Sequence, residues 1–188
     1  MRYLLLIKHS LPEIIENSPA NSWPLSETGR KRCALLARAT APYAPEILIS
    51  SHEVKAQQTA ELLAAQLGRE FIIADDLHEH QREQVPFLSA AKFQEDVGLL
   101  FEKPGELIMG SETADQAHHR FEKAVHQTLD NHPQKNIAIV AHGTVISLFV
   151  SHLTGLDPFS LWQRLGLPAV VVLALPGLEL VEIMERME

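Results

Sequence analysis

The chain has 188 residues, 46% of them hydrophobic and 21% charged, with a formal net charge of −8 at pH 7, which suits one soluble globular domain. The acidic balance argues against nucleic acid and anionic membranes as partners, because both attract a basic face. With Cys33 as its only cysteine, no apolar run of transmembrane length and no signal-peptide pattern, we expect a cytoplasmic protein without a disulfide framework.

The first predicted element is a short strand over residues 4–7, followed at once by Lys8-His9-Ser10. Four apolar residues in a row indicate a central strand of a parallel sheet, buried on both faces. Ligands of open α/β sheets bind outside the carboxyl ends of the strands, so His9 lies where chemistry is expected. Residues 11–23 contain two prolines, two asparagines and no period, and we predict a loop over the end of this strand.

Further along the chain, apolar runs alternate with helical periods. Ser26 is the predicted N-cap of the first helix, and Gly68 and Gly155 are predicted helix stops. Pro176-Gly177 between two apolar runs predicts a terminal hairpin over 170–175 and 179–183. The other expected elements are helices over about 27–40, 53–67, 89–101, 113–129 and 144–153, and strands over 46–50, 71–73 and 137–141.

This alternation predicts a single α/β domain over residues 1–188, with a mixed, mostly parallel sheet and helices on both faces. Residues 81–110 have the least regular pattern and are a candidate lid or insertion beside the site. The oligomeric state is not set by the sequence, although an edge strand or the terminal hairpin offers a surface for a homodimer.

Chemically active side chains follow several predicted strands directly. His9 and His142 each come after an apolar strand, Lys55 comes one turn after Ser50-Ser51, and Glu79 follows the third strand. If the four strands are parallel neighbours, their carboxyl ends open on one side of the sheet. Two imidazoles, one carboxyl group and the ammonium groups of Lys8 and Lys55 would then meet in one cleft.

Such a set suits phosphoryl transfer through a covalent histidine, because a neutral imidazole nitrogen is a competent nucleophile near pH 7. Catalysis of this transfer is mostly positioning and stabilisation of negative charge. Lys8, Lys55, a protonated His142 and the peptide N–H groups after Gly143 are candidate donors to the phosphoryl oxygens. Glu79 could protonate the departing oxygen and later deprotonate water, a double role that requires a raised pKa.

Six motifs, in order, resemble those of the histidine phosphatase superfamily, which has the phosphoglycerate-mutase-like fold. Each motif is a weak signal alone, but six in the right order along nearly the whole chain are a strong one. They are Leu5-Leu6-Ile7-Lys8-His9-Ser10, Pro24-Leu25-Ser26-Glu27-Thr28-Gly29, the segment 50–60, Leu77-His78-Glu79, Gly110-Ser111-Glu112-Thr113 with Arg120, and Val140-Ala141-His142-Gly143.

The resemblance implies that His9 is the phosphorylated nucleophile, that His142 lines the phosphate pocket and that Glu79 is the proton donor. Lys8 and Lys55 stand where the family has two pocket arginines, and lysine lacks the planar fork that binds phosphate oxygens in pairs. Ser10 stands in place of a glycine, where its hydroxyl could also contact phosphate. Arg82, three residues after Glu79, is a hypothetical replacement guanidinium.

The favoured function is therefore a histidine phosphatase that hydrolyses a small-molecule phosphomonoester. An alternative of another class is a phosphate- or phosphoprotein-binding pseudoenzyme, in which the two lysines have cost catalysis. A phosphoglycerate-mutase-type phosphotransferase is favoured less, because a mutase needs a closed, dry pocket that protects its intermediate from water.

Each of these residues also has a purely structural interpretation. Taken alone, His9 would be a buried strand-end histidine, and Lys55 a solvated helix lysine; His80 is balanced between pocket and surface. The ten histidines include His78-x-His80 and His118-His119, but such pairs without further ligands are poor evidence for a metal, and we expect no required metal or cofactor. Arg120 is predicted to form an ion pair with Glu112.

Overall fold

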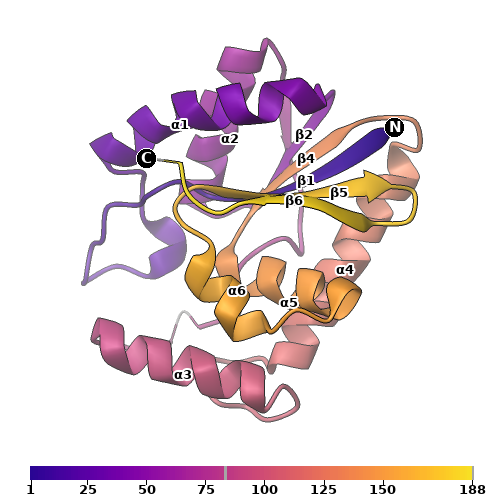
Figure 1. Cartoon of the computed structure of the whole chain (residues 1–188). Helices are drawn as coiled ribbons and strands as arrows, with labels where there is room; N and C mark the ends of the chain where they lie inside the picture. The colour runs from indigo at the N-terminus through magenta and orange to yellow at the C-terminus, as the bar shows by residue number, and fades with distance from the viewer. Residues whose placement is uncertain (83, 188) are drawn as a thin grey trace.

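The computed structural model describes residues 1–82 and 84–187, which form a six-stranded mixed sheet between two layers of helices (Figure 1). The strand order is β3-β2-β4-β1-β5-β6. The strands are β1 (Arg2–Lys8), β2 (Ile47–Ser50), β3 (Phe71–Ile73), β4 (Ile137–Ala141), β5 (Ala169–Leu175) and β6 (Glu179–Met184). The predicted single α/β domain with a mixed sheet is thus confirmed.

The expected helices are present, with ends within about two residues of those predicted. Ser26 caps α1 by accepting from the Gly29 N–H, and Gly68 ends α2 in the left-handed conformation. The helices are α1 (Glu27–Thr40), α2 (Val54–Leu67), α3 (Ala90–Glu102), α4 (Ala114–Asn131), α5 (Gly143–Thr154) and α6 (Pro158–Arg164), with short 3-10 turns at Ala20–Ser22 and Ala41–Tyr43.

Helix α6 is absent from the sequence prediction. Its start carries a recognisable signal, because Asp157 precedes Pro158 and its carboxylate accepts from the Ser160 N–H at 2.7 Å. Proline favours the first position of a helix, and aspartate favours the cap before it. The helix is only seven residues long, too short for an apolar period to stand out.

The predicted central strand is confirmed by its neighbours. Strand β1 pairs in parallel with β4 and antiparallel with β5, and its residues Leu4 to Ile7 are fully buried. Leu4 and Leu6 face one core, and Leu5 and Ile7 face the other, as the alternation of side chains along a strand requires. Because β3, β2, β4 and β1 are all parallel, their carboxyl ends share one edge of the sheet.

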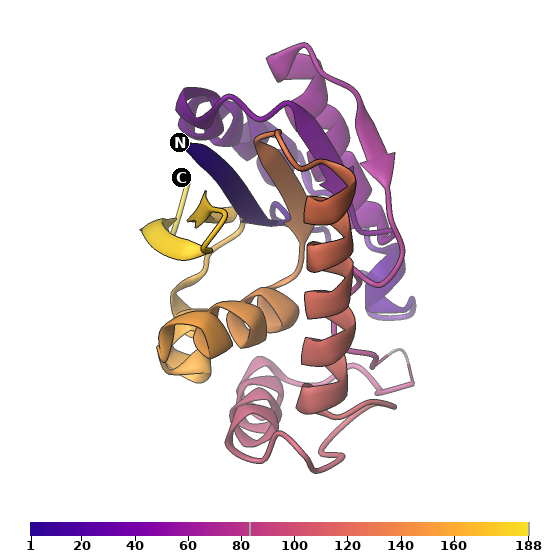
Figure 2. The ribbon, with the colours of Figure 1, turned by 90° about the vertical axis from the view of Figure 1, so that its right-hand side faces the viewer.

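The two faces of the sheet are covered by different helices. Helices α1 and α2 lie on one face, and α4, α5 and α6 lie on the other (Figure 1). Helix α3 lies away from the sheet beside α6 (Figure 2), where its Phe101 ring is 6.5 Å from that of Phe159. Within the described ranges, no helix combines the length and apolar character needed to cross a membrane.

The segment 81–110, expected to be a lid or insertion, contains α3 and one internal position, residue 83, that lies outside the described residues. Its assignment as a lid remains a prediction.

The loop after β1 approaches the first helix closely at Gly29. A Cβ at this position would lie 2.0 Å from the Leu11 carbonyl oxygen. Glycine therefore lets the loop after β1 pack directly on α1.

Candidate active site

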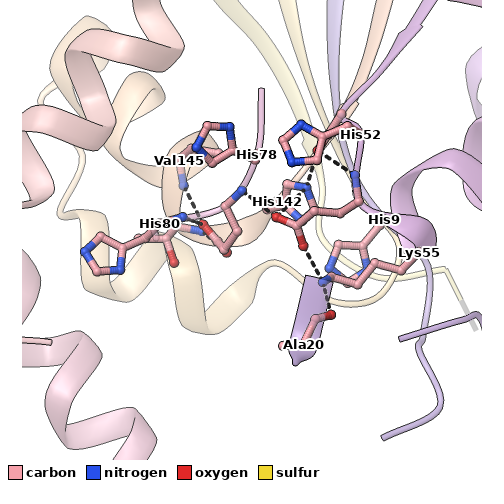
Figure 3. A network of polar contacts seen from close by, with 12 residues as sticks. His9, Ala20, His52, Lys55, His78, His80, His142 and Val145 are labelled. Atoms are coloured by element: carbon pink, nitrogen blue, oxygen red, sulfur yellow. Dashed lines mark hydrogen bonds and ion pairs between the residues drawn. The ribbon is translucent and has the colours of Figure 1, made fainter. Parts of the chain in front are cut away.

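His9 and His142 meet at the carboxyl ends of β1 and β4. Their ring centroids are 5.2 Å apart (Figure 3). The Nδ1 atom of His9 lies 2.8 Å from the Ser10 carbonyl oxygen; a carbonyl only accepts, so Nδ1 carries the proton and Nε2 has the free electron pair. Burial lowers the pKa of His9 well below 6.5, and the charge of Lys55 adds to this effect. His9 is therefore a neutral imidazole with an available Nε2.

His142 is fully buried beside this nucleophile. Its Nε2 lies 2.9 Å from the Ser51 hydroxyl and 3.4 Å from Glu53 Oε1. Burial lowers its pKa well below 6.5, and the positive charge of Lys55 acts in the same direction. In this unliganded pocket the condition that His142 be protonated is therefore not met, and a neutral His142 has a single N–H to donate.

Glu53 is a site residue that the sequence analysis did not find. Its side chain is 5% exposed, and Oε1 accepts from the Glu79 N–H at 2.8 Å. Burial would raise the pKa of this carboxyl, but the Lys55 ammonium, 2.5 Å from Oε2, outweighs burial and lowers it. The available signal is weak, because Glu53 stands at the N-cap of α2, two residues before Lys55, where the sequence pattern indicates only a helix start.

Both lysines already have hydrogen-bond partners. Lys55 donates to the Ala20 carbonyl at 2.6 Å as well as to Glu53 (Figure 3). Lys8 donates to the Leu165 carbonyl at 2.6 Å, and burial lowers its pKa to about 8. Both ammonium groups would have to change partners, or share them, to hold a phosphoryl group.

Glu79 lies at the N-terminus of α5. Its Oε2 accepts from the Thr144 N–H at 3.1 Å, and its Oε1 from the Val145 N–H at 3.3 Å. These are the N–H groups after Gly143 that were expected to bind phosphate, so in this structure a carboxylate uses them, as the positive end of a helix favours. Burial alone would raise the pKa of Glu79, but the Arg82 charge and the backbone donors outweigh it and lower the pKa below 4.5. The raised pKa that the double role of Glu79 requires is therefore not present in the unliganded site.

Two predicted phosphate contacts have a different role in the structure. The Ser10 hydroxyl is fully buried and donates to the Gly29 carbonyl at 2.7 Å; it joins the strand end to α1, and the prediction that it contacts phosphate is not supported. Gly143 provides space, because a Cβ there would lie 3.1 Å from Lys8 Cε and 3.3 Å from Trp162 Nε1. A glycine at position 143 therefore leaves room for the Lys8 side chain.

Arg82 borders the pocket and stacks on Phe93. Its Nη2 atom is 3.7 Å from Glu79 Oε2, and its guanidinium carbon is 4.7 Å from the centre of the Phe93 ring. Nη1 is buried without a hydrogen-bond partner. A buried donor without a partner is costly, so this position is suited to an acceptor from a bound ligand.

Buried contacts with Arg120 and Glu112 hold the loop that carries Glu79. The predicted ion pair of Arg120 with Glu112 is confirmed at 2.7 Å, and Arg120 also donates to the His78 and Glu79 carbonyls. His80 is 2% exposed and lies 2.7 Å from the Glu112 carbonyl. These groups position Glu79, and His80 also lines the small cavity beside it.

The remaining free space beside the lysine and the carboxylates is small. A cavity of about 30 Å³ is lined by Ala20, Asn21, Glu53, Lys55, Glu79, His80 and Arg82. That volume accommodates about two water molecules. The lining places Lys55 and Arg82 beside the carboxylates of Glu53 and Glu79.

Two comparisons of the sequence find similar proteins. The sequence model of the histidine phosphatase superfamily (branch 1) matches residues 13–176, beginning just after Lys8-His9-Ser10. The uncharacterized phosphatase PhoE of Bacillus subtilis (strain 168) is 23% identical over 138 residues, which cover 72% of this chain and 67% of that protein.

Solved structures show the same fold over nearly the whole chain. A phosphoserine phosphatase from Entamoeba histolytica, in complex with phosphoserine, superposes with a TM-score of 0.79 at 14% identity, covering 98% of this chain and 97% of that one. A mycobacterial glucosyl-3-phosphoglycerate phosphatase with inorganic phosphate gives a TM-score of 0.77 at 18% identity, covering 99% and 98%. At these identities the likeness establishes the fold, and it includes β1, which the family match leaves out.

Proposed function

This chain belongs to the histidine phosphatase superfamily, and from that premise we propose that it hydrolyses phosphomonoesters through a phosphohistidine at His9. The observation that carries the proposal is the state of His9: a neutral ring whose Nδ1–H is bound to the Ser10 carbonyl, leaving Nε2 beside His142 and Lys55. The phosphatase names of the relatives support the same class of reaction.

In the first step, Nε2 of His9 attacks phosphorus, the bond from phosphorus to the ester oxygen breaks, and Glu79 protonates the departing alkoxide. In the second step, water attacks phosphorus, Glu79 takes a proton from that water, the bond from phosphorus to Nε2 of His9 breaks, and inorganic phosphate leaves. Glu79 is ionised in the unliganded site, so the substrate itself has to supply the pKa shift. A phosphoryl dianion beside Glu79 raises the pKa of that carboxyl, because like charges disfavour ionisation.

The charge of the pocket limits how tightly a phosphate dianion can bind. Lys8, Lys55 and Arg82 face the carboxylates of Glu53 and Glu79, which leaves one net positive charge. Of the two carboxylates, Glu53 holds Lys55 directly. Glu53 thus competes with the substrate for Lys55, which stands where the family has a pocket arginine.

We expect Glu53→Gln to bind orthovanadate or inorganic phosphate about tenfold more tightly than the parent, since one nearby unit charge is removed while the shape is kept. The measurement is calorimetric titration at pH 7, with the exposed Glu61→Gln as the control for a general loss of negative charge. Weaker binding by Glu53→Gln than by Glu61→Gln would show instead that Glu53 supports Lys55 in its binding position.

Trapping the intermediate tests the proposed function directly. The protein is mixed with an aryl phosphate, quenched in alkali within one turnover and analysed by mass spectrometry. We expect a phosphate adduct on the peptide that contains His9, since phosphohistidine survives alkaline quenching. The adduct should decay in water once substrate is exhausted, whereas persistence until a second phosphate acceptor is added would indicate a mutase.

The second candidate function, a phosphate-binding pseudoenzyme, is favoured by one observation. Lys8 and Lys55 already donate to backbone carbonyls and to Glu53, so phosphate could bind without being activated. In that case phosphate would bind in a titration, while no adduct would form at His9 and no phosphate would be released from any ester.

A further inference from the structure

A second, much larger cavity adjoins the small pocket at Glu53 and Lys55. Its volume is about 770 Å³, within the range of small-molecule sites. Arg82 and Ala20 line both cavities, so the two spaces adjoin at these two residues. The large cavity lies between the loop after β1 and the segment that leads into α3.

The walls of this cavity are mainly apolar. Among the residues that line it are Ile14, Pro19 and Trp23 on one side and Val85, Phe87 and Phe93 on the other. The Trp23 and Phe87 rings are 6.5 Å apart. Trp23 Nε1 already donates to the Ile15 and Ser18 carbonyls, so a ligand would meet only the apolar face of the indole.

Two of these apolar side chains are costly to leave in water. Phe87 is 52% exposed and Ile14 is 59% exposed, and clustered exposed apolar groups often mark a binding site. Arg82 is the one cation among the described residues that line the cavity, and Glu16 adds a negative charge. A leaving group that carries a carboxylate or a second phosphate would find no further cation here.

We propose that the substrate is a phosphomonoester with a bulky apolar leaving group, aromatic or hydrocarbon, which fills this cavity while its phosphoryl group reacts at His9. Arg82 lines both cavities, and in this proposal its guanidinium binds an oxygen of the phosphate ester. This inference rests on the proposed function and adds the class of substrate.

A series of straight-chain alkyl monophosphates from ethyl to octyl tests the cavity, because the leaving alcohols have nearly the same chemistry and differ in apolar length. We expect kcat/KM to rise about two- to fourfold for each added methylene until the cavity is full. A kcat/KM that stays flat or falls with chain length would overturn the apolar site while leaving the proposed hydrolysis intact.

Matched variants assign the effect to the cavity. Phe87→Ser removes one apolar wall and should flatten the dependence on chain length, mainly through a higher KM for octyl phosphate. Ile72→Ser is the control, since Ile72 is equally exposed, at 55% against 52% for Phe87, and lies on edge strand β3. An unchanged dependence in Phe87→Ser would remove the cavity from the explanation.

If no alkyl phosphate is hydrolysed, the proposed function fails by itself, and binding then decides the apolar site. Calorimetry with ethyl and octyl phosphate would show tighter binding of octyl phosphate in the parent and in Ile72→Ser, but not in Phe87→Ser. Equal affinity of the parent for both ligands would overturn the inference.

Discussion

Replacing His9 with alanine is expected to lower kcat/KM for an alkyl or aryl phosphate by on the order of 10³-fold or more, because the attacking nitrogen is removed. Binding of phosphate should change much less, since His9 is neutral and Lys8, Lys55 and Arg82 supply the charge. Steady-state release of inorganic phosphate measures the first quantity, and calorimetric titration measures the second.

The control for His9→Ala is His126→Ala, which removes an exposed histidine from α4. His9→Asn is a second variant, because its amide can still donate to the Ser10 carbonyl and preserves the local contact. Thermal unfolding of each variant separates lost chemistry from lost folding. Turnover by His9→Asn that equals the parent's would remove His9 as nucleophile, whatever its effect on stability.

The position of His9 could be predicted because it depends on a strong local pattern and a general rule. Four apolar residues can be buried on both faces only in an inner strand, and the ligand site of an α/β sheet lies beyond the carboxyl ends of such strands. The same reasoning applies to His142 after β4. Parallel pairing of β4 with β1 and β2 then brings the strand ends together.

The hydrogen-bond partners and pKa values of the site residues could not be predicted, because they depend largely on contacts between residues far apart in sequence. Glu53 is significant only because the Glu79 N–H and the Lys55 ammonium both reach its carboxylate. The pKa of Glu79 is lowered first by the charge of Arg82, three residues away, and then by His142 and the backbone of α5, more than 60 residues later in the chain. The Ser10 hydroxyl likewise donates to the Gly29 carbonyl and does not face the cleft. This orientation depends on how α1 packs against the strand end.

Two carboxylates, those of Glu53 and Glu79, lie in one pocket, so the proton donor has to be identified between them. Glu79 has Arg82 near Oε2 at 3.7 Å, toward the large cavity that we assign to the leaving group. Glu53 has both oxygens engaged deeper in the pocket, by the Glu79 N–H and by Lys55. Both oxygens of Glu79 also accept backbone N–H groups, so what favours Glu79 as the proposed donor is its neighbour Arg82, which lines the large cavity.

Replacing Glu79 with glutamine is expected to lower kcat for an alkyl phosphate by about 10²- to 10⁴-fold, the usual contribution of a general acid. The loss should shrink strongly with 4-nitrophenyl phosphate, because nitrophenolate leaves without protonation. The comparison of the two substrates, measured in steady state, isolates proton donation from any effect on binding.

Glu53→Gln is the matched variant for this test, since it makes the same chemical change in the same pocket. It should show no preferential loss with the alkyl phosphate, because Glu53 does not protonate the leaving oxygen. If the dependence on the leaving group followed Glu53→Gln and not Glu79→Gln, the donor would be Glu53, and Glu79 would serve to cap α5. Both carboxyls have a lowered pKa in the unliganded site. Either donor must therefore gain its proton as the phosphate dianion binds. Substrate binding should thus be accompanied by uptake of one proton, at the residue that the two variants identify.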